Sequence, residues 1–567
     1  MSETDSREPR PDEPVELPTG YYLDNFQTLL DFVDELYGDI LSEEERRFSS
    51  GFRTLDLSAR RLFVRLLMRK GPVFRSDKLH YPEIGEVTLA AASLESAGLL
   101  CRNHDRQVEE VARLLLRHEL IGLLEAEPKS GREQVRTGWS RYRKEELLDR
   151  LLGEGSTEIL AERIQHLFDW YELNHLQIVD VYRLLFFGNL GQDLTEFVLL
   201  DLGLVRYERY LIHRKDRLFT DRDVLARTLE VLHLREACCQ ALEMEDLPLL
   251  ERICDALPEA LGESSIARRR DRILNAVGRF CERRGDLVRA LDYYGRASAP
   301  PARERFARVQ DKLGDAKGAL DVCESILAEP REDAEVLFAN MFRAKMQKKL
   351  GLEVHKPKRL QHPDQTLLLE RKPGRKVEEA VLIAMAEKGI PGFYAENRFW
   401  LSLFGLAFWD IVFLPVRGAF FNRYQRGPMG TFSSEFRKLR LPEIERRLEE
   451  CADRDRLERR VLETHDEKQG IANYFVAWHP DLKAQVRTCL GHVPGPHLAL
   501  IFDRLSRDPG EYRSGFPDLL LFPDSETYMM AEVKGPGDQL QHNQRGWLRY
   551  FAERGLPYKV IKVKWLS

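Results

Sequence analysis

One short stretch near the C-terminus limits the possible folds of this chain more than any other. Two apolar runs, Leu519–Phe522 and Tyr528–Val533, each lie beside a carboxylate. Short apolar runs bounded by turn residues predict β-strands. Because strand side chains alternate between two faces, Glu532 and Lys534 share one face. If the two strands are neighbours, Asp518 joins that face, so two carboxylates and one ammonium meet at a sheet edge.

The residues after this stretch predict the rest of a small α/β domain. A Gly-Pro pair ends the second run, and Asp538 is a candidate N-cap for a helix that contains Gln544 and Trp547. A further strand is predicted at Tyr558–Trp565 (YKVIKVKW), which would pair after that helix. The C-terminal region is therefore expected to be an α/β domain with its polar site at one sheet edge.

The order Pro-Asp, then Glu-x-Lys, is typical of a metal-dependent nuclease. A hard cation such as Mg²⁺ prefers carboxylate oxygens and keeps some of its waters. The ion polarises a scissile phosphate and lowers the pKa of the attacking water. A lysine can orient that water or offset the charge that builds on the phosphorane. A Pro-Asp pair followed by Glu-x-Lys also occurs by chance and on ordinary surface strands. The prediction of a nuclease therefore depends on the flanking apolar runs and on the helix that follows.

The rest of the chain is mainly helical. From Tyr21 to about Leu152, the pattern is mostly helical, with apolar residues at spacings of three and four. Further along, Arg284–Asp292 and Leu313–Asp321 align without a gap, and each contains a glycine followed by a small alanine. This is typical of a tetratricopeptide-like helical repeat. A spacer is the favoured role for it, with a partner or DNA-shaping surface as the alternative.

The most apolar run, Trp400–Val416, is predicted to be buried core. It is shorter than the ~20 residues that a membrane span needs, and Asp410 interrupts it. A buried carboxylate needs a partner, and Arg423 is the candidate. No membrane association is expected.

Basic residues gather in two segments, each expected to contact DNA phosphates. The first follows a short apolar helix, 115–124, and precedes another, 143–152, so this region resembles a SAP module, a helix–loop–helix that holds DNA through its backbone. Trp139 and Tyr142 within it could stack on bases or pack on protein. The alternative for a basic run is a solvated loop. Its cations are Lys129, Arg132, Arg136, Arg141, Arg143 and Lys144. The second segment, a predicted linker, holds Lys356, Lys358, Arg359, Arg371, Lys372, Arg375 and Lys376.

Composition narrows the class of protein. The 567 residues carry 87 basic and 93 acidic side chains, which excludes a histone-like polycation but not a local basic groove. The eight cysteines form no Cys-x-x-Cys pair, so no zinc ribbon is indicated, and a reduced compartment is expected. Residues 1–20 have no apolar run and are expected to be a disordered tail rather than a secretory signal. No P-loop motif is present, so no nucleotide cofactor is expected.

Several longer stretches carry a resemblance to a known family. GFPDLLLF, AEVKGPGDQLQ and QRGW resemble the VRR-NUC domain of the PD-(D/E)xK nuclease superfamily. More closely, FVLLDLGLVRYERYLIHRKDRLFTDRD and YAENRFWLSLFGLAFWDIVF resemble blocks of the Fanconi-associated nuclease family. The order of SAP-like, helical-repeat and VRR-NUC segments also agrees with that family. The resemblance spans most of the chain.

This resemblance implies the site residues. The family's metal carboxylates fall on Glu396, Asp518 and Glu532, its metal-bound carbonyl on Val533 and its catalytic lysine on Lys534. Two further residues are assigned more loosely: Gln544 as support for the site, and Arg513 as a contact to a 5′ phosphate. The expected cofactor is Mg²⁺ or Mn²⁺. The implied reactions are 5′-flap endonuclease and 5′-to-3′ exonuclease cleavage in interstrand crosslink repair, with branched or flapped DNA bound by a monomer.

The sequence thus predicts a multidomain, mainly α protein that ends in an α/β VRR-NUC core. The expected segments are a tail (1–20), a helical domain (21–110), a SAP-like region (111–235), a helical repeat with a basic linker (236–376) and the nuclease domain (377–567). Animal members of the family carry a ubiquitin-binding zinc finger whose spacing is not found here, so a bacterial cytoplasmic protein is expected, or a nuclear one if eukaryotic. Two alternatives stay open: a Holliday-junction resolvase and a non-catalytic scaffold that binds DNA structures.

Overall fold

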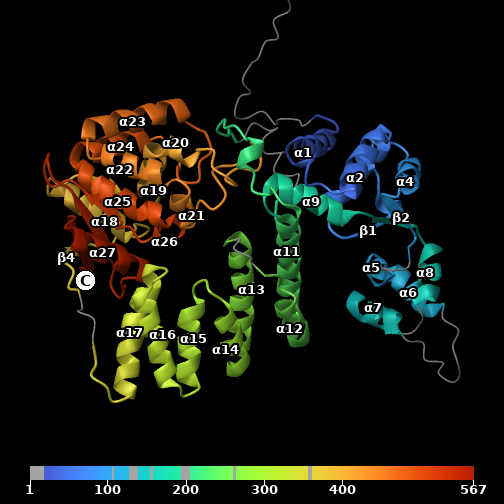
Figure 1. The fold of residues 1–567 in the computed structure, drawn as a ribbon, viewed down its shortest axis with the longest axis horizontal. Coiled ribbons are helices and arrows are strands. Elements are labelled where there is room, and N and C mark those ends of the chain that lie inside the picture. The colour runs from blue at the N-terminus through green and yellow to red at the C-terminus, as the bar shows by residue number, and fades with distance from the viewer. Residues whose placement is uncertain are drawn as a thin grey trace, which may run out of the picture. The chain divides into compact units, whose positions relative to one another are not determined.

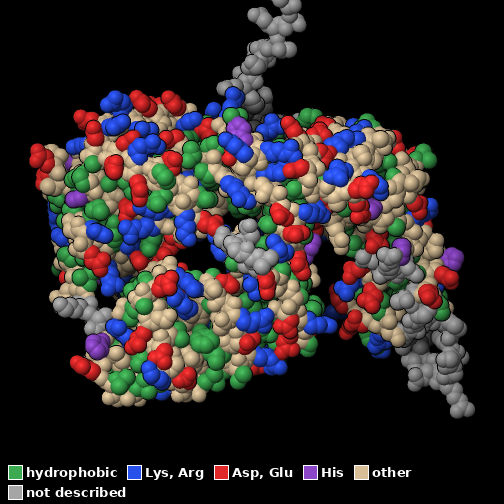
Figure 2. Space-filling model, in the orientation of Figure 1, with side chains coloured by type: hydrophobic (Ala, Val, Ile, Leu, Met, Phe, Trp, Pro, Cys, Tyr) green, Lys and Arg blue, Asp and Glu red, His purple; other side chains and the backbone are tan. Residues whose placement is uncertain are grey.

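The computed structural model describes residues 18–104, 108–126, 138–153, 157–192, 205–259, 264–355 and 360–566. The chain forms two compact units, Met1–Leu204 and Val205–Ser567, and each is described by itself (Figure 1). Within the described ranges, every helix is too short or too polar to cross a membrane. On the face in Figure 2, acidic and basic side chains are interspersed, in keeping with the near balance of charge.

The first unit is mostly helical, as predicted. In its first helix the residues Phe26, Leu29, Leu30 and Val33 are buried, so the three-and-four spacing does mark the inner face. The unit also holds a three-stranded antiparallel sheet of order β1-β3-β2, which was not predicted, because strands of three or four residues are too short to show alternation. Its helices are α1 (Tyr21–Tyr37), α2 (Glu43–Thr54), α3 (Leu57–Leu67), α4 (Val87–Ser96), α5 (Val108–Arg113), α6 (Arg117–Glu125), α7 (Lys144–Gly153), α8 (Thr157–Gln165) and α9 (Leu176–Phe187). Its strands are β1 (Val73–Arg75), β2 (Leu100–Arg102) and β3 (Trp170–Leu173), and short 3₁₀ turns lie at Ser76–Lys78 and Trp139–Arg141.

The second unit begins with the helical repeat, whose prediction is confirmed. Gly285 adopts φ 82°, the Asp286 side chain accepts a hydrogen bond from the N–H of Arg289, and Ala290 is fully buried against the neighbouring helix. Gly314, Asp315 and Ala319 repeat these three features. Positive φ favours glycine at each helix start. The helices are α11 (Arg222–Glu243), α12 (Leu247–Asp255), α13 (Ser264–Arg283), α14 (Leu287–Arg296), α15 (Ala302–Lys312), α16 (Ala316–Ala328) and α17 (Asp333–Lys349), with a 3₁₀ turn at Arg214–Asp216 before them.

A five-stranded mixed sheet of order β4-β8-β7-β6-β5 forms the C-terminal core. Three strands lie where they were predicted, to within a residue or two at their ends. The predicted basic linker is corrected: it contains β4, which pairs in parallel with β8 and so belongs to the nuclease sheet. The strands are β4 (Asp364–Leu369), β5 (Gly392–Tyr394), β6 (Leu519–Leu521), β7 (Met529–Lys534) and β8 (Tyr558–Trp565).

Helices cover this sheet, and the predicted core run is confirmed. The apolar residues from Trp400 to Phe413 lie in the largest buried cluster, together with residues of β6 and α27. Helix α27 begins after Gln541, so the prediction that Asp538 is its N-cap is wrong; the Asp538 carboxylate instead accepts a bond from the N–H of Gly535. The helices are α18 (Val377–Glu387), α19 (Arg398–Ala407), α20 (Trp409–Val412), α21 (Glu435–Lys438), α22 (Leu441–Glu450), α23 (Arg454–Lys468), α24 (Leu482–His492), α25 (Gly495–Arg507), α26 (Pro509–Tyr512) and α27 (His542–Arg554).

Candidate active site

Strand β6 brings the predicted site residues to one end of the sheet. On one side β6 pairs with β5, with Leu519 opposite Tyr394, and on the other with β7, with Leu519 opposite Ala531. Just before β6, the carbonyl of Asp518 accepts a hydrogen bond of 2.8 Å from the N–H of Ala395. Glu396 therefore follows directly on the residue that is bonded to Asp518, although the two acids are far apart in the chain.

Asp518, Glu532 and Lys534 lie together, as the strand periodicity predicts. The Asp518 Oδ2 accepts a bond of 2.8 Å from the N–H of Val533, which fixes this carboxylate against β7. Lys534 Nζ lies 2.9 Å from Glu532 Oε1 and donates a bond of 3.0 Å to Gln544 Oε1. The structure thus places Gln544 beside the lysine.

Burial disfavours the charged forms of the Asp518 and Glu532 carboxylates. Glu532 is fully buried, and Asp518 nearly so. Burial, and then the charge of Asp518, raises the pKa of the Glu532 carboxyl against the opposing effect of Lys534. Burial also raises the pKa of Asp518, although the Val533 N–H bond opposes the shift. The charged forms need a compensating cation beyond the single lysine.

The residues fit a divalent cation. Both oxygens of Glu532 are buried and accept no well-directed hydrogen bond from the described residues, even though Lys534 is close. An unsatisfied buried carboxylate is costly unless a cation coordinates it. Carboxylate oxygens such as these, at one end of the interior strands β6 and β7, are the ligands that Mg²⁺ and Mn²⁺ prefer. The N–H of Val533 binds Asp518, and the role of its carbonyl stays a prediction.

Glu396 is held beside this pair but is engaged by its neighbours. Its Oε2 accepts a hydrogen bond from the Tyr394 hydroxyl, and its Oε1 accepts one of 3.0 Å from Asn397 Nδ2. Within the described residues, no three His, Cys, Asp or Glu side chains are already grouped as a metal site. One acid was missed by sequence reasoning: Glu378, in the first turn of α18, raises the pKa of Asp518 more than Glu396 does, although burial is the main cause. Only the position of α18 beside β5 and β7 reveals it.

Comparison with known proteins identifies the family. A "Fanconi-associated nuclease 1 homolog" of Pseudomonas aeruginosa is 34% identical over 563 residues, which cover 96% of each chain. The chain belongs to the Fanconi-associated nuclease family. Its VRR-NUC domain matches the family model of that description over residues 452–565, and residues 20–101 match the model described as "FAN1, HTH domain". The VRR-NUC match includes Asp518, Glu532 and Lys534 but not Glu396.

More distant relatives and solved structures agree. The Arabidopsis thaliana homolog of Fanconi-associated nuclease 1 is 25% identical over 96% of this chain and 67% of its own length. A crystal structure described as paFAN1 bound to 2nt 5′flap DNA with gap superposes with a TM-score of 0.85 at 32% identity, over 98% of this chain and 100% of that chain. The multidomain architecture predicted for this nuclease is therefore confirmed. The helix-turn-helix domain at its N-terminus was not predicted.

The residues of this Fanconi-associated nuclease that were predicted to bind DNA are only partly described. Helices α6 and α7 match the two predicted SAP-like helices and pack together. Lys129, Arg132, Arg136, Lys356, Lys358 and Arg359 lie outside the described residues. Arg141 and Arg143 are exposed, whereas Lys144 Nζ donates a bond of 2.8 Å to the Arg113 carbonyl. Trp139 and Tyr142 pack against the core of their unit, and Arg150 lies 4.1 Å over the Tyr142 ring, so these rings favour packing over base stacking.

The other predicted cations have varied surroundings. Arg513 is exposed, with its guanidinium 4.7 Å from the centre of the Phe432 ring. Arg371, Lys372 and Lys376 are exposed between β4 and α18, and Arg375 lies 3.8 Å from Glu379. These side chains are available to phosphates, but their contact with DNA stays a prediction.

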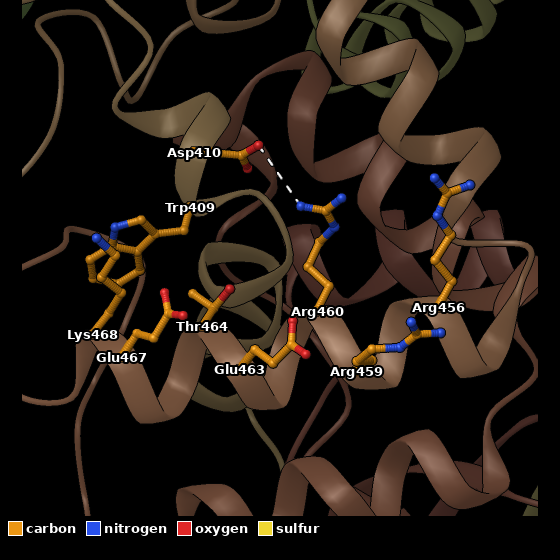
Figure 3. Close-up of a pocket in the computed structure, with 9 residues that line it drawn as sticks. All are labelled: Trp409, Asp410, Arg456, Arg459, Arg460, Glu463, Thr464, Glu467 and Lys468. Carbon is orange, nitrogen blue, oxygen red and sulfur yellow. Dashed lines mark ion pairs between the residues drawn. The ribbon is translucent and has the colours of Figure 1, made fainter.

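A separate cavity of about 400 Å³ lies along α23, lined by Trp409, Asp410 and one face of that helix (Figure 3). None of the predicted site residues lines it. The prediction for Asp410, which lines this cavity, is wrong in two respects. Its side chain is 63% exposed rather than buried, and it pairs with Arg447 at 2.8 Å rather than with Arg423. Arg460 lies 3.9 Å from the same oxygen of Asp410.

Proposed function

We propose that this chain hydrolyses DNA phosphodiesters with Mg²⁺ or Mn²⁺ held by Asp518, Glu532 and Glu396. The observation that carries the proposal is the fully buried Glu532 carboxylate. Among the described residues its oxygens accept no well-directed hydrogen bond, while Asp518 and Lys534 lie beside it. A bound divalent cation polarises the phosphate and lowers the pKa of the attacking water.

The chain's own residues set the geometry for that reaction. The N–H of Val533 fixes one oxygen of Asp518, so this carboxylate cannot turn away from β7. The contacts of Lys534 with Gln544 and Glu532 hold its ammonium at the site. From there it orients the water or offsets charge on the phosphorane. Because Lys534 is only 13% exposed, its charge is weakly screened.

For the substrate, we propose a 5′ flap, with 5′-to-3′ exonuclease action and a role in interstrand crosslink repair. Support comes from the family resemblance and from the similar solved structure of paFAN1, which is described as bound to 2nt 5′flap DNA with gap. The exposed Arg141, Arg143 and Arg513 would contact phosphates of that DNA. A monomer that carries its own DNA-binding domains would suffice for a single cut.

The test uses a labelled 5′-flap duplex, with and without Mn²⁺. Wild type should cleave near the junction only with metal. Asp518→Asn should cleave at least ~100-fold more slowly while still binding DNA, because it removes a metal ligand and little else. Glu526→Gln is the matched control, since it changes an exposed acid on the loop between β6 and β7 and should leave cleavage unchanged.

Other outcomes would replace the proposal. Paired cuts across a four-way junction by a dimer would indicate a resolvase. DNA binding without cleavage by either wild type or variant would indicate a scaffold. Metal-independent cleavage, or full cleavage by Asp518→Asn, would refute the assignment of the site.

A further inference from the structure

Asn397, between Glu396 and the start of α19, has an unusual backbone. Its φ is 34° and its ψ is −65°, and it is one of four non-glycine residues with positive φ in the described part of the chain. The negative ψ also places it outside the left-handed helical region that asparagine tolerates. Such strain persists only where the surroundings impose it, and it concentrates at functional sites.

The side chain of Asn397 does not act as a helix cap. An asparagine that precedes a helix usually accepts a hydrogen bond from an N–H of the first turn. Here Asn397 makes no such bond to α19. Instead its Oδ1 accepts a bond of 3.3 Å from the N–H of Phe516, and its Nδ2 donates one of 3.0 Å to Glu396 Oε1. The amide therefore links Glu396 to the segment that leads into Asp518.

An amide suits this link, because it carries one acceptor and one donor on a short side chain. The backbone N–H of Phe516 requires an acceptor, and the carboxylate of Glu396 requires a donor, so the two ends of the Asn397 side chain are assigned without ambiguity. An aspartate would serve Phe516 but would repel Glu396. The Tyr394 hydroxyl binds the other oxygen of Glu396, so one donor fixes each oxygen.

We propose that Asn397 is a positioning residue, which presets the Glu396 carboxylate as a metal ligand relative to Asp518. This inference rests on the proposed metal-dependent hydrolysis. Hydrogen bonds to a ligating carboxylate fix its orientation, and their loss typically lowers metal affinity by about 10- to 100-fold. The strained backbone is the structural cost of directing the amide toward Glu396 rather than along α19.

The chain supplies a matched control at Asn103, in the other unit. Asn103 also has positive φ, 53°, and its side chain makes the same two kinds of bond. Its Oδ1 accepts from the N–H of Trp170 at 2.9 Å, and its Nδ2 donates to Asp169 Oδ1 at 2.6 Å. Asn103→Gly therefore removes the same two kinds of hydrogen bond from a part of the fold that contains no predicted site residue.

The experiment compares Asn397→Gly, Asn397→Asp, Asn103→Gly and Asp518→Asn in the full chain. Glycine lacks the Cβ that makes a positive φ costly, so this variant should fold. Mn²⁺ binding is measured by electron paramagnetic resonance of the free ion, and flap cleavage is measured as a function of Mn²⁺. The dissociation constant for Mn²⁺ should rise about 10- to 100-fold in Asn397→Gly and at least as much in Asn397→Asp. Saturating Mn²⁺ should restore much of kcat, with KM for DNA unchanged, and Asn103→Gly should bind Mn²⁺ as wild type does.

The outcomes separate this inference from the proposed function. If Asp518→Asn loses Mn²⁺ binding while both Asn397 variants keep wild-type affinity, the positioning role is refuted and the metal site stands. If Asp518→Asn also binds Mn²⁺ and cleaves as wild type does, the proposed site itself fails. A loss of affinity in Asn103→Gly as large as in Asn397→Gly would show a general effect on folding and would refute the assignment.

Discussion

Two partly buried carboxyl groups, Glu511 and Glu332, lie where the helical repeat meets the nuclease core, and the titration of Glu511 gives a quantitative test of the structure. Glu511, in α26, accepts a hydrogen bond of 2.9 Å from the N–H of Asp333, at the start of α17. Burial, and then the charges of Asp333 and Glu332, raises the pKa of Glu511 to about 7. Burial also raises the pKa of Glu332 to about 7. The hydrogen bond from the Asp333 N–H opposes the shift of the Glu511 pKa, and Arg504 lies 2.6 Å from Asp333 Oδ2.

The magnitude follows from the linkage between protonation and folding. The folded state binds a proton at Glu511 up to about pH 7, whereas the unfolded chain releases it near 4.5. This contribution to stability is therefore fully present below pH 4.5 and is lost as pH rises through 7. A rise in pKa from 4.5 to about 7 corresponds to about 3 kcal/mol at pH 8. Glu511→Gln removes the charge and keeps the acceptor for Asp333, so it should recover up to that amount at pH 8 and little at pH 5.

Thermal unfolding of the full chain at pH 5 and pH 8 measures this difference. At about 2 °C per kcal/mol for a unit of this size, Glu511→Gln should raise Tm by about 6 °C at pH 8. Glu329→Gln is the control, because it neutralises an exposed acid at the end of α16. An increase in Tm that is equal at both pH values, or absent at pH 8, would refute the view that this carboxyl group is protonated in the folded state.

Two further predictions concern other parts of the chain. Arg447→Ala should lower the free energy of unfolding by about 2 kcal/mol, because the buried guanidinium also binds the Ala407 carbonyl. Asp410→Asn should lower it by less than about 1 kcal/mol, because that acid is exposed. Calorimetry of both variants measures the two losses, and equal losses would contradict the reasoning. Replacing both Arg141 and Arg143 by alanine should weaken DNA binding. The slope of the logarithm of the association constant against the logarithm of salt concentration should become shallower by about 0.9 per lost phosphate contact. A salt titration measures this slope, and an unchanged slope would exclude the two arginines from the DNA interface.

The sequence predicts those strands of the nuclease core whose apolar residues are also the residues that the fold buries. The strand at Tyr558–Trp565 was predicted to the residue, and most of its apolar side chains are buried where it pairs with β4 and β7. The pair Glu532 and Lys534 follows from strand periodicity alone, and the structure places the two side chains 2.9 Å apart. In the C-terminal sheet, two strands were not predicted: β4, at the sheet edge, buries only Leu367 fully, and β5 has no buried residue. Their hydrogen bonds to neighbouring strands define them, and no periodicity marks them in advance.

The same reasoning explains why Glu396 could be reached only through a family resemblance. Nothing near Glu396 in the chain distinguishes it from a polar residue before a helix. Its proximity to Asp518 depends on the pairing of β5 with β6, which begins at Gly392. A Cβ on Gly392 would lie 2.5 Å from the carbonyl oxygen of Leu520, so only glycine allows the two strands to approach this closely. The position of Glu396 beside Asp518 thus depends on Gly392 and on the three-residue edge strand β5. The hydrophobic pattern of this strand is weak, so its register with β6 determines which carboxylates lie close together.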